Sequence, residues 1–188
     1  MASQTALRVL AFAGSLRKAS LNKALLQAAR EAAPAQMAVE IFDLAEVPLY
    51  DEDVRQTGQP QAVADLRAGI AAADGVLIAT PEYNFSFSGV VKNAIDWASR
   101  PPDQPFARKP IAILGASPSR LGTARAQYQL RQCFLFLDGR VMNRPEMMLG
   151  DAGQAFDDGK RLTDDQARER LAAFLAAFAD FIGQQRPG

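Results

Sequence analysis

The 188-residue sequence contains no histidine and only one cysteine. Without histidine there can be no Ser-His-Asp or Cys-His triad, no histidine-ligated metal and no histidine acid–base catalysis. Cys133 alone forms neither an intrachain disulfide nor a cysteine metal cluster, and an unpaired thiol suits a reducing cytoplasm. We therefore expect no resident metal, and we expect the chemistry to come from a bound cofactor.

Charge of one sign is also lacking, because 21 Lys and Arg residues balance 21 Asp and Glu residues. A net charge of +0 gives no general attraction to nucleic acid or to an anionic membrane. No apolar run approaches the ~20 residues that span a bilayer, and the stretch 1–5 is too short and polar for a signal peptide. The length predicts one domain over residues 1–188, and the unpaired Cys133 predicts a cytoplasmic location.

Short apolar runs alternate with amphipathic stretches along the chain. The runs predict buried strands at 7–13, 39–42, 75–80 and 110–116, with 140–143 and 147–149 as pieces of a fifth. Helices are predicted at 20–33, 62–73, 89–99 and 122–137, and a last one follows a capping box at 163–166. Residues 48–60 are predicted to be a surface loop. This alternation predicts an α/β fold, a flavodoxin-like doubly wound five-stranded parallel sheet of order 2-1-3-4-5 with helices on both faces.

Ligands of such sheets bind beyond the carboxyl ends of the strands, so the loops after strands one, three and four are the candidate site. The first loop, residues 14–22, has one glycine and matches neither GxGxxG nor GxxxxGK[ST]. Its hydroxyls, its amide, Arg17 and the N–H groups of a helix start fit a single terminal phosphate, as in FMN. The alternative is an ordinary Ser or Asn helix cap with Arg17 in solvent.

The second loop, residues 80–89, interleaves polar and aromatic side chains. Glu82 and Asn84 flank Tyr83, and Phe85 and Phe87 follow. Polar groups can bond the edge of a flat ring while aromatics pack beside it; alternatively, these aromatics cover the end of the core. The third loop, residues 115–123, has small residues that allow close approach to a ligand, or it is a plain strand–helix turn.

These motifs together resemble the NADPH-dependent FMN reductase family, in particular its quinone and chromate reductase branch. The resemblance covers nearly the whole chain and is carried by Gly14-Ser15-Leu16-Arg17-Lys18 with Ser20 and Asn22, by Pro81-Glu82-Tyr83-Asn84, and by Gly89-x-x-Lys92-Asn93-Ala94-Ile95-Asp96-Trp97. It implies one non-covalent FMN per subunit, NAD(P)H as electron donor, and homodimers or homotetramers. Ser88 departs from the family pattern, in which many relatives have Pro before the matching Gly.

The resemblance also implies which residues hold the cofactor. The phosphate would be surrounded by Ser15, Arg17, Ser20 and Asn22, with Gly14, Leu16 and Leu21 in the same loop. The isoalloxazine ring would be held by Pro81, Glu82, Tyr83, Asn84 and Phe85, partly through backbone N–H groups, and Ser117 would lie near the flavin. No catalytic side chain is expected, because hydride transfer is the chemistry of the cofactors themselves.

Two further features of the fourth predicted helix bear on assembly and reactivity. Arg125, Tyr128 and Arg131 share one side of it. They are either a solvated polar face or a subunit contact in which Arg125 and Tyr128 meet Glu146 of a neighbour. Cys133 falls on the apolar stripe of the same helix and is predicted to be a core thiol.

The resulting hypothesis is an FMN-dependent NAD(P)H oxidoreductase with a ping-pong cycle. Its acceptors would be small molecules: quinones, flavins, chromate, azo compounds or nitroaromatics. The alternative is a flavodoxin-like electron carrier without NAD(P)H activity of its own, although such carriers are typically strongly acidic and this chain is neutral. A flavin-binding scaffold without turnover is a second alternative.

Overall fold

The computed structural model describes residues 6–185; the stretch 1–5, for which we predicted no signal peptide, lies outside them. Its centre is a parallel sheet whose strands run in the order β2-β1-β3-β6-β7. The bounds are β1 (Leu7–Ala13), β2 (Met37–Phe42), β3 (Gly75–Ala79), β6 (Pro110–Ala116) and β7 (Arg140–Val141). A short β8 (Met147–Leu149) pairs with β6 further along, so two pieces fill the fifth position. The predicted flavodoxin-like order is confirmed.

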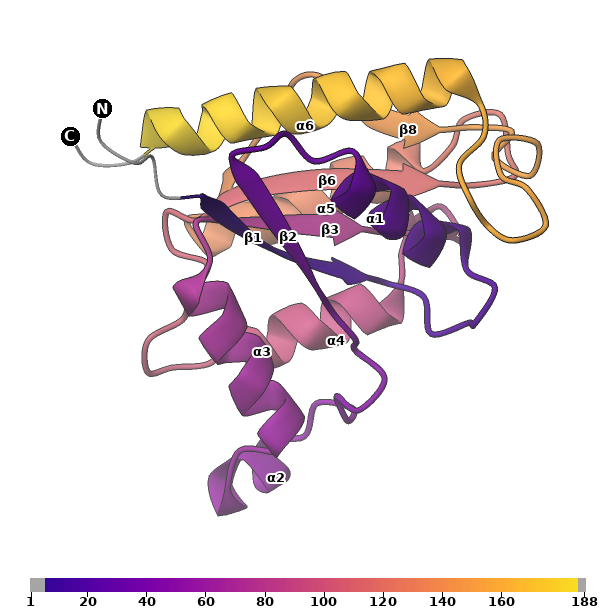
Figure 1. Ribbon diagram of the computed structural model, residues 1–188. Helices are drawn as coiled ribbons and strands as arrows, with labels where there is room; N and C mark the ends of the chain where they lie inside the picture. Colours follow the sequence, from indigo (N-terminus) through magenta and orange to yellow (C-terminus); the bar gives the residue numbers. More distant parts are fainter. Residues whose placement is uncertain (1–5, 186–188) are drawn as a thin grey trace.

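Helices cover both faces of this sheet (Figure 1). One face packs against α1 (Leu21–Glu31) and α6 (Asp165–Gln185), and the other against α3 (Gln61–Ala72), α4 (Gly89–Ala98) and α5 (Ala124–Phe136). The central strands β3 and β6 are buried throughout because each carries apolar side chains on both sides. Within residues 6–185, none of the helices has the length and apolar character needed to cross a membrane.

The structure corrects four local predictions. The predicted surface loop at 48–60 contains a short helix, α2 (Glu52–Thr57), none of whose residues is buried. The predicted second loop contains a small hairpin of β4 (Glu82–Tyr83) and β5 (Ser86–Phe87). Asp164, not Thr163, caps α6, since its Oδ1 accepts from the Ala167 N–H at 2.7 Å. Cys133 is half-buried against the core rather than fully inside it.

Candidate functional site

The carboxyl ends of β1, β3 and β6 lie at one edge of the sheet, and a cleft of about 360 Å³ opens there. All three predicted loops contribute to it, as does the segment after β8. From the first loop come Ser15, Arg17, Ala19, Ser20, Leu21 and Asn22; from the second Pro81, Glu82 and Tyr83; from the third Ala116, Ser117 and Pro118; and from the last segment Gly153, Phe156 and Lys160. The loops that we selected from the sequence therefore converge on one cavity.

Four predicted site residues do not line the cleft: Gly14, Leu16, Asn84 and Phe85. Gly14 lies beneath it, where a Cβ atom would stand 2.5 Å from Val91 Cγ2 and would also collide with Ser88 Oγ. Conversely, the cleft is also lined by six residues that were not predicted individually: Ala19, Ala116, Pro118, Gly153, Phe156 and Lys160. The last three follow a strand of only three residues, and no phosphate or aromatic motif marks them.

The start of α1 supplies hydrogen-bond donors to the cleft. Ser20 is the N-cap, and its Oγ accepts from the Lys23 N–H at 3.2 Å, which leaves the hydroxyl proton free to be donated. The first-turn N–H groups of Leu21 and Asn22 have no acceptor within the helix. Arg17 on the same loop and Lys160 from the opposite wall add positive charge. This donor set, at a helix N-terminus, fits a dianionic phosphate such as that of FMN.

The side chain of Asn22 has a different role from the one we predicted. It is 3 % exposed and bonds the backbone of Ala116 twice, donating from Nδ2 to the carbonyl at 3.0 Å and accepting the N–H on Oδ1 at 3.0 Å. These bonds join the first turn of α1 to the end of β6, 94 residues away. Asn22 thus holds two walls of the cleft together, and its backbone N–H is the group that it can offer a phosphate.

The carboxylate of Glu82 points toward α5. Its side chain is 6 % exposed and accepts from the backbone N–H groups of Arg125 at 3.0 Å and Ala126 at 3.2 Å. It also accepts from Arg125 Nε at 2.6 Å. The side chain of the helix cap residue Thr123 accepts from no backbone N–H of the first turn, so Glu82 supplies the missing cap and pairs with a cation. Only the backbone of Glu82 is left for a ring.

The hairpin turn at Asn84 and Phe85 has left-handed backbone at both residues, with φ of 51° and 65°. Two positive φ values in a two-residue hairpin are typical of a type I′ turn, which normally favours Asn-Gly. Contacts from α5 hold Phe85 in this costly conformation. Gln129 donates to its carbonyl at 2.8 Å, and the Arg125 guanidinium lies 3.7 Å from its ring centroid. The hairpin leaves two aromatics exposed, Tyr83, which lines the cleft, and Phe85, which does not.

The residues predicted to meet across a subunit interface make contacts within one chain. Arg125 pairs with Glu82, as described above. Tyr128 hydrogen-bonds Glu146, and this bond raises the pKa of the Tyr128 hydroxyl. Neither contact tests whether these side chains also face a second copy, so the interface stays a prediction.

A flavodoxin-like sheet with a phosphate-compatible loop and an aromatic turn at its carboxyl edge defines an oxidoreductase of the flavoprotein class. The family model described as NADPH-dependent FMN reductase matches residues 7–154. The chain therefore belongs to the NADPH-dependent FMN reductase family. The predicted cofactor, FMN, and the predicted electron donor, NAD(P)H, are confirmed.

The chain is similar to several known proteins over nearly its full length. The chain is 53% identical over 180 residues to an NAD(P)H-dependent FMN reductase of Pseudomonas aeruginosa, covering 96% of this chain and 97% of the relative. It is 46% identical to a quinone reductase of Escherichia coli, covering 94% and 95%. Among solved structures, the flavoenzyme NAD(P)H:(acceptor) oxidoreductase FerB of Paracoccus denitrificans superimposes with a TM-score of 0.87 at 34% identity, covering 95% and 98%.

Proposed function

We propose that this chain binds FMN non-covalently in the cleft and reduces quinones and similar small acceptors with NAD(P)H. The observation that carries the proposal is the convergence of the phosphate-compatible loop, the aromatic hairpin and the loop at Ser117 on one cavity. In this arrangement Ser15, Ser20, Arg17 and the first-turn N–H groups of α1 hold the phosphate. The backbone of residues 81–85 holds the isoalloxazine ring, with Ser117 nearby.

When bound, FMN would supply the redox chemistry, which is hydride transfer from NAD(P)H and electron transfer to a second substrate in a ping-pong exchange. The protein binds the cofactor and the substrates and orients them. Asn22 and Glu82 fix the loops that form the walls, and the hairpin turn holds Tyr83 beside the cleft. Hydride transfer from NAD(P)H requires no side-chain base, in accord with the absence of histidine.

Acceptor choice follows from the openness of the cleft mouth. Tyr83 lines the cleft and is 50 % exposed, so flat aromatic molecules can stack there without a tight enclosing pocket. Quinones are the first candidates, since a quinone reductase is among the relatives. Free flavins, nitroaromatics, azo compounds and chromate are further ones.

The proposal extends to assembly and location. A homodimer or homotetramer is supported by α5, on which Leu135 and Phe136 are 82 % and 91 % exposed and Tyr128 is half exposed. Exposed large apolar side chains on one helix favour a partner surface, and Arg125, Tyr128 and Glu146 would border it. A cytoplasmic location is supported by the unpaired Cys133.

The test is an anaerobic reduction. The protein is loaded with FMN, freed of excess cofactor and mixed with NADH or NADPH while flavin absorbance is followed. Rapid bleaching, then recovery of the colour on addition of a quinone, is the expected result. A yellow protein that stays oxidised would instead identify the electron carrier, and a protein that takes up no FMN would reject every flavin function.

A further inference from the structure

The wall of the cleft that faces α1 is formed by residues 152–164, which we call the facing segment. It is attached to the third loop, because the Ala152 N–H donates to the Ser117 carbonyl at 3.0 Å. It is also closed on itself, because the Thr163 N–H donates to the Ala155 carbonyl at 2.9 Å. The facing segment is therefore a loop whose two ends are tied together beside the cleft.

The tip of the facing segment has an ordered backbone. Phe156 and Leu162 form an antiparallel bridge across it. Within the tip, the Lys160 N–H donates to the Asp157 carbonyl at 2.9 Å, and Asp157 Oδ1 accepts from the Arg161 N–H at 2.8 Å. Lys160 has left-handed backbone, with φ of 64°. These contacts fix the Lys160 backbone before a ligand binds, so binding has only the side chain left to order.

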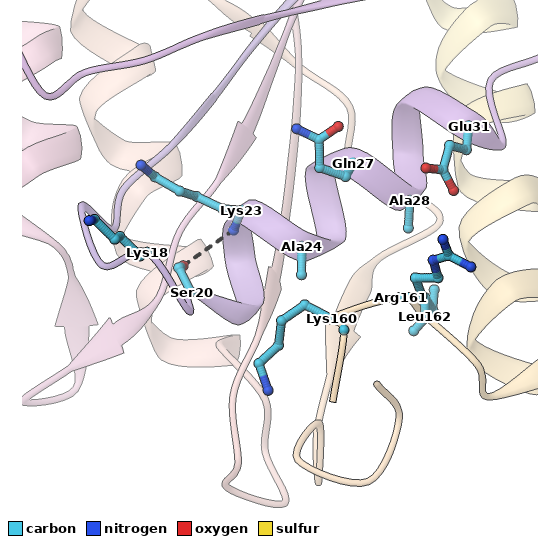
Figure 2. Close-up of a pocket in the computed structure, with 11 residues that line it drawn as sticks. Lys18, Ser20, Lys23, Ala24, Gln27, Ala28, Glu31, Lys160, Arg161 and Leu162 are labelled. Atoms are coloured by element: carbon cyan, nitrogen blue, oxygen red, sulfur yellow. Dashed lines mark hydrogen bonds between the residues drawn. The ribbon is translucent and has the colours of Figure 1, made fainter. Parts of the chain in front are cut away.

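The two cations of the tip extend toward opposite ends of α1. A groove of about 390 Å³ separates α1 from the tip (Figure 2). Figure 2 shows Lys160 extending toward the end of α1 that carries Ser20, and Arg161 near Glu31 at the other end. Ser20 and Lys160 line both this groove and the cleft, whereas Arg161 lines the groove but not the cleft. Lys160 therefore faces the phosphate-compatible start of α1, and Arg161 does not.

Lys160 also completes the charge of the cleft. Of residues 6–185, the charged ones that line it are Arg17, Glu82 and Lys160. The Glu82 carboxylate is already paired with Arg125 and caps α5. A phosphate monoester carries about −1.5 to −2 charges at pH 7, so Arg17 alone would leave part of that charge without a cation. The Lys160 ammonium supplies a second cation and three hydrogen-bond donors.

We propose that Lys160 is a further binding residue for the FMN phosphate and gives the cleft its preference for FMN over riboflavin. The ammonium contacts the phosphate oxygens from the side opposite Ser20, so the phosphate is held between α1 and the facing segment. Riboflavin has the same ring system without the phosphate and gains nothing from Lys160. Asp157 and Asp158 do not line the cleft, so the tip contributes a cation and no carboxylate to it. The inference rests on the proposed function, because it presumes that FMN occupies the cleft.

The test measures the dissociation constants of FMN and riboflavin for the flavin-free, full-length protein. Binding is followed by the change in flavin fluorescence, in a buffer without inorganic phosphate. The proteins are wild type, Lys160→Gln, Lys160→Arg and Arg161→Gln. Arg161 is the matched control, because it is an exposed cation on the same tip that does not line the cleft.

We expect Lys160→Gln to bind FMN roughly fivefold to tenfold more weakly than wild type, because a charge-assisted hydrogen bond is lost. Its affinity for riboflavin should stay within about twofold of wild type, since no phosphate is present to lose that bond. Lys160→Arg keeps the charge and should retain most of the affinity for FMN, and Arg161→Gln should bind both flavins like wild type. At 1 M salt, where the Debye length is about 3 Å, the difference between wild type and Lys160→Gln should shrink.

An unchanged affinity of Lys160→Gln for FMN would overturn the assignment. An equal loss for FMN and riboflavin would also overturn it, since that result indicates a role in the shape of the cleft. A loss in Arg161→Gln as large as that in Lys160→Gln would reduce the effect to general surface charge. Should Lys160→Gln fail to fold, Lys160→Asn, which suits left-handed backbone, should show the same selective loss.

The same titrations separate this inference from the proposed function. Wild-type protein that binds neither flavin would reject the flavin site itself. Wild-type protein that binds FMN as tightly as Lys160→Gln does would reject only the role of Lys160.

Discussion

At the scale of single residues, three positions hold the walls of the cleft together through contacts within the chain: Gly14, Asn22 and Glu82. Asn22 joins α1 to β6, Glu82 caps α5, and Gly14 allows the end of β1 to pack under Ser88 and Val91. Each of them acts through a neighbour distant in sequence. Their substitution should therefore affect stability as well as flavin binding.

Gly14→Ala tests this packing. The added methyl group has no space against Val91 and Ser88, so we expect a loss of about 1–3 kcal/mol in the free energy of unfolding, measured by urea titration. We also expect weaker FMN binding, because the second loop must move. Gly89→Ala is the matched control: it begins α4 and has nothing within 4 Å of its Cβ position, so it should be neutral or slightly stabilising. Equal stability of the two variants would refute the packing role.

Glu52 gives a prediction about acid stability. Hydrogen bonds from Arg55 and Tyr50 lower the pKa of its carboxyl from 4.5 to about 2. Because the folded pKa is below the unfolded one, this stabilisation is present above pH 4.5 and is lost as the pH falls toward 2. Glu52→Gln should therefore lower the urea midpoint at pH 6 and differ less from wild type at pH 3. A difference that does not change with pH would contradict the pKa assignment.

At the scale of elements, the hairpin β4–β5 and α5 form one unit through Glu82. Glu82→Gln keeps the shape but removes the charge that caps α5 and pairs with Arg125, and we expect it to cost about 1–3 kcal/mol of stability in urea unfolding. Lys92→Gln is the comparison, since the Lys92–Asp96 pair is exposed and should contribute less than about 1 kcal/mol. An equal loss in the free energy of unfolding for Glu82→Gln and Lys92→Gln would contradict the role of Glu82 as the cap of α5.

The main elements could be predicted because their residues alone fix them. The runs at β3 and β6 contain no charged residue, the run at β1 is interrupted only by Arg8, and the α1 stripe repeats at helical spacing. By contrast, α2 buries none of its residues and so has no apolar stripe to reveal it. The hairpin was missed because its strands have two residues each and its turn is Asn-Phe, which local preference disfavours and contacts from α5 maintain.

The candidate site, like the fold, could be predicted only in part. The loops could be located, since parallel strands bring their carboxyl ends to one edge. The direction of each side chain could not, because the partners of Asn22 and Glu82 lie 94 and 43 residues away. Lys160 was missed because its place in the cleft depends on how the turn 156–162 folds back over α1.

At the scale of the whole molecule, the exposed apolar end of α5 predicts self-association. Phe136→Ser removes the most exposed of its large apolar side chains and should shift the protein toward monomer in light scattering coupled to size exclusion. Leu49→Ser, which removes an 85 % exposed side chain from another part of the chain, should leave the mass unchanged. A wild-type protein that is already monomeric would contradict the proposed assembly.

The most direct test of the flavin site is a crystal structure of the FMN complex. It should show the phosphate among Ser15, Arg17, Ser20 and the first turn of α1, with the tricyclic ring against the backbone of 81–85. FMN bound elsewhere, or a cleft that remains vacant at saturating FMN, would contradict the account.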